Sequence, residues 1–209
     1  MKQITFYLDF VSPYAWLAFH EAPKALQGIS HHMQYRPVLL GALLQRHSNP
    51  GPAGIDGKRE WTYRHASWLG KSLGMGLDMP QQHPFPPLPL LRLALECSRD
   101  GSINRWVAET IFRHVWLGGA DALETQRLAA LRETLAMQLQ SHPAEDAKRL
   151  LRENTEAAAQ KKVFGVPAWE VDGRIFWGLD SLPMLRAYLQ GDAWFEQGWD
   201  QVEQIKTGL

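Results

Sequence analysis

The chain has 209 residues, of which 45% are hydrophobic and 21% are charged, as in an ordinary globular protein. Its 22 basic and 22 acidic residues give a formal net charge of +0, so no basic surface for nucleic acid or an anionic membrane is expected. No apolar run approaches the ~20 residues that cross a bilayer, and the N-terminus has no signal-peptide core, so we expect a cytoplasmic protein.

The N-terminal segment predicts a β-α-β unit. Residues 3–10 (QITFYLDF) are rich in β-branched and aromatic residues and predict a strand. Ser12 and Pro13 then occupy the positions of a helix N-cap and a first-turn residue, so a helix is expected over residues 14–26. Residues 33–38 (MQYRPV) predict the second strand, which completes the unit.

The middle of the chain is predicted to be helical. Residues 48–57 form a loop by composition, and residues 79–89 contain five prolines and are expected to be extended. Apolar residues at spacings of three and four predict helices on either side of the proline-rich segment. The predicted helices cover residues 61–73, 90–99, 103–116, 124–138 and 144–162.

The C-terminal part returns to strands. Residues 168–171 and 174–177 flank Asp172-Gly173, which is a strong signal for a two-residue hairpin turn, and a last helix is expected over residues 182–189. The order of elements predicts an α/β protein in which a thioredoxin-like sheet is interrupted by a helical insertion. We predict a discontinuous thioredoxin-like domain, residues 1–45 and 160–209, and an inserted all-helical domain, residues 46–159.

Ser12 is the main catalytic candidate. Thiol–disulfide oxidoreductases of this fold carry a CxxC motif where the first helix begins, because the helix N-terminus stabilises a thiolate. The only cysteine here is Cys97, so the chain has no redox pair, and its simplest role is that of a buried small hydrophobe. A hydroxyl at position 12 can instead donate a hydrogen bond to a bound thiolate. The alternative is that Ser12 only caps the helix.

Val166-Pro167 and Asp180 are candidates for binding a ligand. A proline at this point of a thioredoxin-like fold is usually cis, and it exposes the backbone of the preceding residue for pairing with a peptide. A plain turn proline is the alternative. The carboxylate of Asp180 is a suitable partner for an ammonium group, although Asp180 or Ser181 can also cap the last helix.

Several segments, in their order and spacing, resemble the kappa-class glutathione transferases and 2-hydroxychromene-2-carboxylate isomerases, which have a DsbA-like thioredoxin fold. The resemblance covers nearly the whole chain. Its strongest parts are residues 9–18 (DFVSPYAWLA), 36–42 (RPVLLGA), 48–50 (SNP), 163–169 (VFGVPAW), 171–173 (VDG) and 176–180 (FWGLD), and residues 83–85 (HPF) and 92–94 (RLA) also fit.

The resemblance implies that glutathione is the thiol, that Ser12 holds its thiolate, and that the site lies between the two domains of a homodimeric protein. No metal site is expected, since the sequence has no HExxH motif or clustered carboxylates. The residues implied to bind glutathione are Asn49, Lys58, Val166, Pro167, Trp177, Gly178, Leu179 and Asp180.

The implied activity is glutathione-dependent isomerisation of a 2-hydroxychromene-2-carboxylate-like compound by reversible thiolate addition, in the degradation of aromatic compounds. The first alternative is a glutathione transferase that conjugates electrophiles. The second is a non-catalytic DsbA-like module that binds thiols or peptides. The chain departs from the family pattern at Gln45, where a Lys is common, at His65, where an Asp follows Arg64, and at Leu179 and Ser181 around Asp180.

Overall fold

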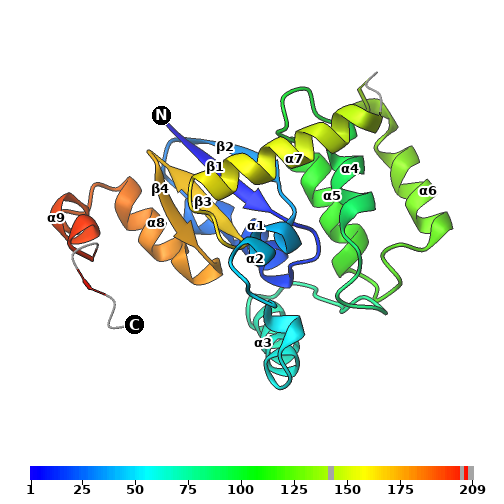
Figure 1. Ribbon diagram of the computed structural model, residues 1–209, viewed down its shortest axis with the longest axis horizontal. Coiled ribbons are helices and arrows are strands. Elements are labelled where there is room, and N and C mark those ends of the chain that lie inside the picture. The colour runs from blue at the N-terminus through cyan, green and yellow to red at the C-terminus, as the bar shows by residue number, and fades with distance from the viewer. Residues whose placement is uncertain (141–143, 203–204, 207–209) are drawn as a thin grey trace.

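The computed structural model describes residues 1–140, 144–202 and 205–206. Four strands form one sheet in the order β2-β1-β3-β4 (Figure 1). Strand β1 runs parallel to β2, whereas β3 is antiparallel to both β1 and β4. A parallel pair needs a crossover connection, and helix α1 (Pro13–Ala25) provides it. The strands are β1 (Lys2–Leu8), β2 (His31–Pro37), β3 (Ala168–Val171) and β4 (Arg174–Trp177).

Six helices lie between β2 and β3, and two more follow the sheet within the described residues. Helices α4, α5 and α6 lie at one end of the molecule and α8 and α9 at the other, while α7 runs from the helical end to the sheet (Figure 1). The six are α2 (Leu40–Arg46), α3 (Lys58–Ser72), α4 (Leu88–Glu96), α5 (Arg105–Trp116), α6 (Thr125–Thr134) and α7 (Ala144–Gln160), and the last two are α8 (Leu182–Leu189) and α9 (Trp194–Gln201).

The side chains of β1 divide between two core clusters. Ile4, Phe6 and Leu8 belong to the main cluster, whereas Tyr7 belongs to a second cluster that includes Leu43 of α2. Since successive side chains of a strand point to opposite faces, the two clusters lie on opposite faces of the sheet. The main cluster includes side chains of α1, α4 and α5, and the second cluster includes side chains of α2 and α7.

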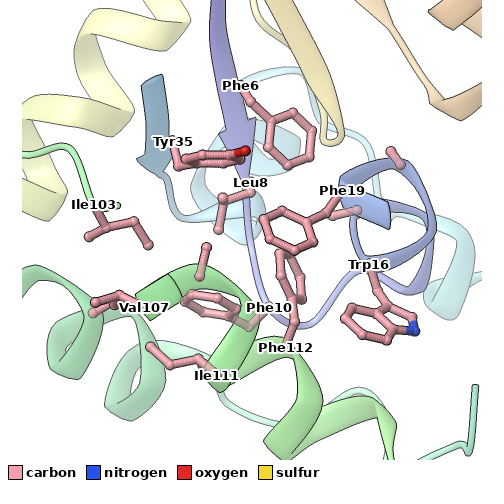
Figure 2. Packing of buried hydrophobic residues seen from close by; sticks show 14 of the residues in the cluster. Phe6, Leu8, Phe10, Trp16, Phe19, Tyr35, Ile103, Val107, Ile111 and Phe112 are labelled. Carbon is pink, nitrogen blue, oxygen red and sulfur yellow. The ribbon is translucent and has the colours of Figure 1, made fainter. Parts of the chain in front are cut away.

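Aromatic rings join the sheet to the helical segment. Phe10 meets Phe112 of α5 edge-on at 4.9 Å between ring centroids, and Phe19 of α1 lies 5.3 Å from the same ring (Figure 2). Phe6 stacks on Trp169 of β3 at 4.1 Å. Burying side chains of this size contributes about 1.5–3 kcal/mol each, so this shared core fixes α5 against the sheet and α1.

The four predicted strands and the α/β thioredoxin-like class are confirmed, although β1 ends at Leu8 and not at residue 10, and β2 begins at His31 and not at residue 33. The predicted helix 124–138 is wrong at its end, because α6 stops at Thr134 and a 3-10 turn over Ala136–Gln138 follows. Helices α2 and α9 were not predicted. The division at residues 46 and 159 stays a prediction. In the described part of the chain, every helix is too short or too polar to span a membrane.

Candidate active site

The hydroxyl of Ser12 lies at the N-terminus of α1. Ser12 is the N-cap residue, with extended backbone angles of φ −91° and ψ 115°, and its Oγ accepts a hydrogen bond from the Ala15 N–H at 3.2 Å. The same oxygen donates to the carbonyl oxygen of Val166 at 3.4 Å. Since a strong O–H···O bond is about 2.7–2.8 Å long, the hydroxyl proton is held loosely. Ser12 is 5% exposed, so the helix terminus acts on it in a largely water-free setting.

The carboxyl group of Asp9 holds the loop that precedes Ser12. Asp9 is fully buried, and its two oxygens accept hydrogen bonds from Val11 N–H at 3.2 Å and Leu40 N–H at 2.9 Å. Burial raises the pKa of Asp9 to about 7, against the opposing effect of these bonds. Because Leu40 is the first residue of α2, Asp9 also connects the Ser12 loop to the start of that helix.

Two further side chains fix the backbone of the same loop. His83 donates from Nε2 to the Val11 carbonyl oxygen at 2.7 Å, because a carbonyl oxygen can only accept. Trp116 of α5 donates from its indole N–H to the Phe10 carbonyl oxygen at 3.1 Å. Burial lowers the pKa of His83, so the neutral imidazole is favoured. The position of Ser12 is therefore set by residues from distant parts of the chain.

A connected series of residues runs from Ser12 to Asp180. The Val166–Pro167 peptide bond is cis, and the Pro167 carbonyl oxygen accepts from the Gly178 N–H at 2.9 Å. Gly178 has a φ of +97°, and a Cβ at this position would collide with the carboxylate of Asp180. Only glycine fits both conditions. The structure therefore places these predicted residues beside one another.

Trp177 and Leu179 flank Gly178 and are less enclosed. Trp177, the last residue of β4, is 53% exposed, and its ring lies 5.0 Å from that of Phe164. A Cβ on Gly165 would approach the indole nitrogen of Trp177 at 3.0 Å. Leu179 opens the 3-10 turn Leu179–Ser181 and packs against the main core cluster. Trp177 is thus the exposed apolar member of the predicted set.

Tyr14 and His65 form a polar pair next to this series. The Tyr14 hydroxyl hydrogen-bonds to His65 Nδ1 at 2.9 Å. Burial, and then the negative charge of Asp180, raise the pKa of Tyr14, which shows that Asp180 lies within electrostatic reach of α1. His65 itself stacks between the exposed rings of Trp61 and Trp68 on α3.

Asn49 and Lys58 are not joined to the other predicted residues. Both are exposed, and the side-chain oxygen of Asn49 accepts from the Gly51 N–H at 2.9 Å. Lys58 is the first residue of α3. Within the described ranges, neither side chain hydrogen-bonds to Ser12, Val166 or Asp180. Asn49 and Lys58 can therefore contact glutathione only if the bound ligand extends from Ser12 to these two side chains.

The single thiol of the chain is unsuited to nucleophilic chemistry. Cys97 follows α4, is buried, and donates from Sγ to the Leu93 carbonyl oxygen at 3.5 Å. Burial raises its pKa to about 11, so the thiolate is scarce at neutral pH. The described residues also contain no group of three His, Cys, Asp or Glu side chains that could hold a metal ion. Thiol chemistry at Ser12 therefore requires a thiol from outside the chain.

Sequence reasoning missed the supporting roles of Asp9 and His83. A charged residue at the end of an apolar strand is a usable signal for Asp9, since a buried carboxyl group needs hydrogen-bond donors. No local pattern indicates that His83 reaches Val11, because the contact joins segments 72 residues apart.

Comparisons with known proteins identify the family of the chain. The family described as the DSBA-like thioredoxin domain matches residues 3–190. The chain is 24% identical to glutathione S-transferase kappa 1 of Rattus norvegicus, over 92% of each chain. It is 26% identical to a 2-hydroxychromene-2-carboxylate isomerase of Pseudomonas putida, over 88% of this chain and 92% of the other.

Solved structures show the same fold. A 2-hydroxychromene-2-carboxylate isomerase superposes with a TM-score of 0.71 at 22% identity, over 98% of this chain and all of the other. The cytosolic disulfide reductase DsbM of Pseudomonas aeruginosa, solved with GSH, gives a TM-score of 0.52 at 15% identity, over 96% of this chain and 99% of the other. These likenesses establish the arrangement of the elements around Ser12.

Proposed function

Because the chain belongs to the DSBA-like thioredoxin domain family and carries a serine where α1 begins, we propose that it is a glutathione-dependent isomerase. Its substrate would be an aromatic compound resembling 2-hydroxychromene-2-carboxylate. The observation that carries the proposal is the Ser12 hydroxyl, which is buried at a helix N-terminus and faces the Val166 carbonyl oxygen at 3.4 Å. Relatives that are named as this isomerase match about nine tenths of the chain.

The residues around Ser12 fit a bound thiol tripeptide. The N-terminus of α1 and the Ser12 hydroxyl favour a negatively charged sulfur, because the hydroxyl can turn from Val166 to donate to it. The backbone of Val166 lies just before the cis bond, where a peptide can pair as an added strand. Asp180 offers a carboxylate to an ammonium group at the far end of the series. Asn49 would contribute from the α2–α3 connection and Lys58 from the first turn of α3.

When bound, glutathione would supply a thiolate for reversible addition to a conjugated double bond of the substrate. The C–S bond formed in the addition would break again once the substrate has rotated about the resulting single bond, so glutathione would not be consumed. The chain contributes by holding the charge on the sulfur and by fixing the donor. Asp9 and His83 keep the Ser12 loop in place without touching the reacting atoms. Asp9 and His83 would thus act as a rigid support that positions one polar group, the Ser12 hydroxyl.

Glutathione conjugation to electrophiles is the second candidate. The kappa-class relatives from Rattus norvegicus and Homo sapiens match 92% of the chain at 24% identity, whereas the isomerases match 88–90% of the chain at 26% identity. The same Ser12 geometry serves both reactions, because each begins with a thiolate. Gln45 and His65 stand where the family pattern has other residues, so these two positions do not favour one reaction over the other. A homodimer and a cytoplasmic location stay predictions.

The experiment is to follow substrate and glutathione together. An isomerase converts many equivalents of an o-hydroxybenzylidenepyruvate or chromene-type substrate while the glutathione concentration stays constant, and turnover needs catalytic glutathione. A transferase consumes one glutathione for each electrophile conjugated. Failure to turn over either substrate class, together with no glutathione binding at millimolar concentration, would contradict both candidates.

A further inference from the structure

A groove of about 920 Å³ lies between α2, α4 and α7. Pockets for small organic molecules span roughly 300–1,000 Å³, so it is large enough to hold one. None of the nine residues that the sequence predicted for catalysis and glutathione binding lines it. The groove is therefore distinct from the predicted glutathione-binding residues, although Gln45, where the chain departs from the family pattern, is one of its lining residues.

The floor of the groove is apolar. Leu43 and Leu151 are 1% and 4% exposed, and Leu39 and Leu88 are half-buried beside them. Leu43 belongs to the second core cluster and Leu151 to the main one, so the groove lies where the two clusters come together. A hydrocarbon or aromatic body would bury apolar surface here.

The remaining lining is rich in cations. Five of the sixteen lining residues are basic and three are acidic. Arg149 is already engaged, because its guanidinium pairs with Asp146 at 3.4 Å and with Glu153 at 2.9 Å. The acidic residues Glu145 and Glu156 are exposed and belong to α7. The basic residues outnumber the acidic ones, and two of them, Arg46 of α2 and Arg92 of α4, lie on elements that contribute no acidic residue to the groove.

Three guanidinium groups in the groove have no partner in the described part of the chain. Arg92 of α4 has a buried Nε without a hydrogen-bond acceptor. The side chains of Arg46 on α2 and Arg152 on α7 form no hydrogen bond or ion pair within residues 1–140, 144–202 and 205–206. A buried donor without an acceptor costs free energy, and an arginine fork is well matched to a carboxylate or phosphate.

We propose that the groove binds an amphipathic organic acid. Its anionic group accepts hydrogen bonds from Arg92, Arg46 and Arg152, and its apolar body lies against Leu39 and Leu88, whose side chains are only half-buried. Helix α2 also connects the groove to the Ser12 loop, since Leu40 N–H donates to Asp9. The ligand is therefore either an acidic substrate of the Ser12 site or a separate anionic effector. The binding itself does not depend on the proposed glutathione chemistry.

The test is calorimetric titration, without glutathione, with 3-phenylpropionate and with its neutral amide, 3-phenylpropionamide. We expect the acid to bind at one site at least about tenfold more tightly than the amide, because charge-assisted hydrogen bonds are available to the acid alone. The double variant Arg46→Gln/Arg152→Gln should reduce the affinity for the acid to that for the amide. Both side chains are exposed, so the fold should be retained.

Arg99→Gln is the matched control, because Arg99 is exposed and bonds to Gln140 outside the groove. It should leave the affinity for the acid unchanged. Arg92→Gln should weaken binding as the double variant does, with its folding checked by circular dichroism. Equal affinities for acid and amide, no saturable binding of the acid, or unchanged binding in the double variant would overturn the proposal.

Repeating the titration with saturating glutathione distinguishes the two sources of ligand. A changed affinity for 3-phenylpropionate supports a substrate that communicates with the Ser12 site, and an unchanged affinity supports a separate effector. Absence of glutathione binding would contradict the proposed function and leave the groove result standing.

Discussion

The two parts of the predicted glutathione site are held in different ways. Ser12 is 5% exposed, and its loop is held by hydrogen bonds of three side chains: Asp9 just after β1, His83 in the α3–α4 connection and Trp116 of α5. Asn49, Lys58 and Asp180 are exposed instead. Orienting a reactive sulfur requires a rigid donor, whereas the charged ends of a peptide can be recognised by solvated side chains at small energetic gain. The difference predicts a graded response to substitution.

The largest effect is expected for Ser12→Ala. Removing a hydroxyl that stabilises the negative charge on the glutathione sulfur should lower kcat/KM by about 100-fold or more. Steady-state kinetics with glutathione and the best substrate measure the loss. Ser72→Ala, which removes an exposed hydroxyl at the end of α3, should retain wild-type rates. A Ser12→Ala enzyme with more than half of the wild-type rate would show that Ser12 is only a helix cap.

Asp9→Asn should change how stability depends on pH. The pKa of Asp9 is about 7 in the folded state, against an ordinary value of 3.8. Between pH 3.8 and about 7, Asp9 is ionised in the unfolded state but still protonated in the folded state. The contribution of Asp9 to the free energy of unfolding therefore falls as pH rises through this range, and it is constant above about pH 7. We expect the difference between wild type and variant to fall by on the order of a few kcal/mol from pH 4 to 7.

Urea unfolding at several pH values measures this difference, since all other titrating groups are common to both proteins. Where Asp9 is ionised, its two oxygens accept from the Val11 and Leu40 N–H groups, whereas the amide of the variant can accept from only one of them. A difference that does not vary with pH would contradict the raised pKa of Asp9.

A smaller effect is expected for Asp180→Asn. Loss of an exposed carboxylate should weaken glutathione binding by about fivefold with little change in kcat. It should also lower the pKa of Tyr14, since the charge of Asp180 contributes to raising it. Calorimetry and ultraviolet tyrosine titration test the two effects separately. Asp192→Asn is the matched control, and a Tyr14 pKa that does not move would contradict the electrostatic effect of Asp180 on Tyr14.

The smallest effect is expected for Lys58→Gln. A single exposed ammonium group that meets a carboxylate in water should change glutathione affinity by about twofold, and less at high salt. Lys71→Gln, at the other end of α3, should have no effect. An effect of Lys58→Gln as large as that of Ser12→Ala would show that the exposed part of the site is as tightly organised as the loop.

Much of this organisation could be predicted from local sequence signals. Ser12 followed by Pro13 correctly predicts where α1 begins, and Asp172-Gly173 correctly predicts the hairpin. Helix α2 escaped prediction because its N-cap, Leu39, has no capping side chain. The N–H groups of Leu39 and Leu40 are instead satisfied by Thr155 and Asp9, which lie far away in sequence.

The same limit applies to the candidate site. Ser12, Val166 and Asp180 could be proposed because each belongs to a recognisable segment. The contacts of His83 and Trp116 with the Ser12 loop join segments that are distant in sequence, and no periodicity or turn signal reports such tertiary contacts. That Arg46, Arg92 and Arg152 line one groove could likewise not be predicted, because they belong to three helices that only the fold brings together.

The central claim is that Ser12 holds a thiolate, and the most direct measurement is the pH titration of glutathione bound to the protein, followed by the ultraviolet absorbance of the thiolate. Free thiols have a pKa of about 8.5. We predict that the bound thiol of the wild type titrates below neutrality and that Ser12→Ala raises this pKa by about one unit or more. The same pKa in both proteins, or a value near that of the free thiol, would contradict the account.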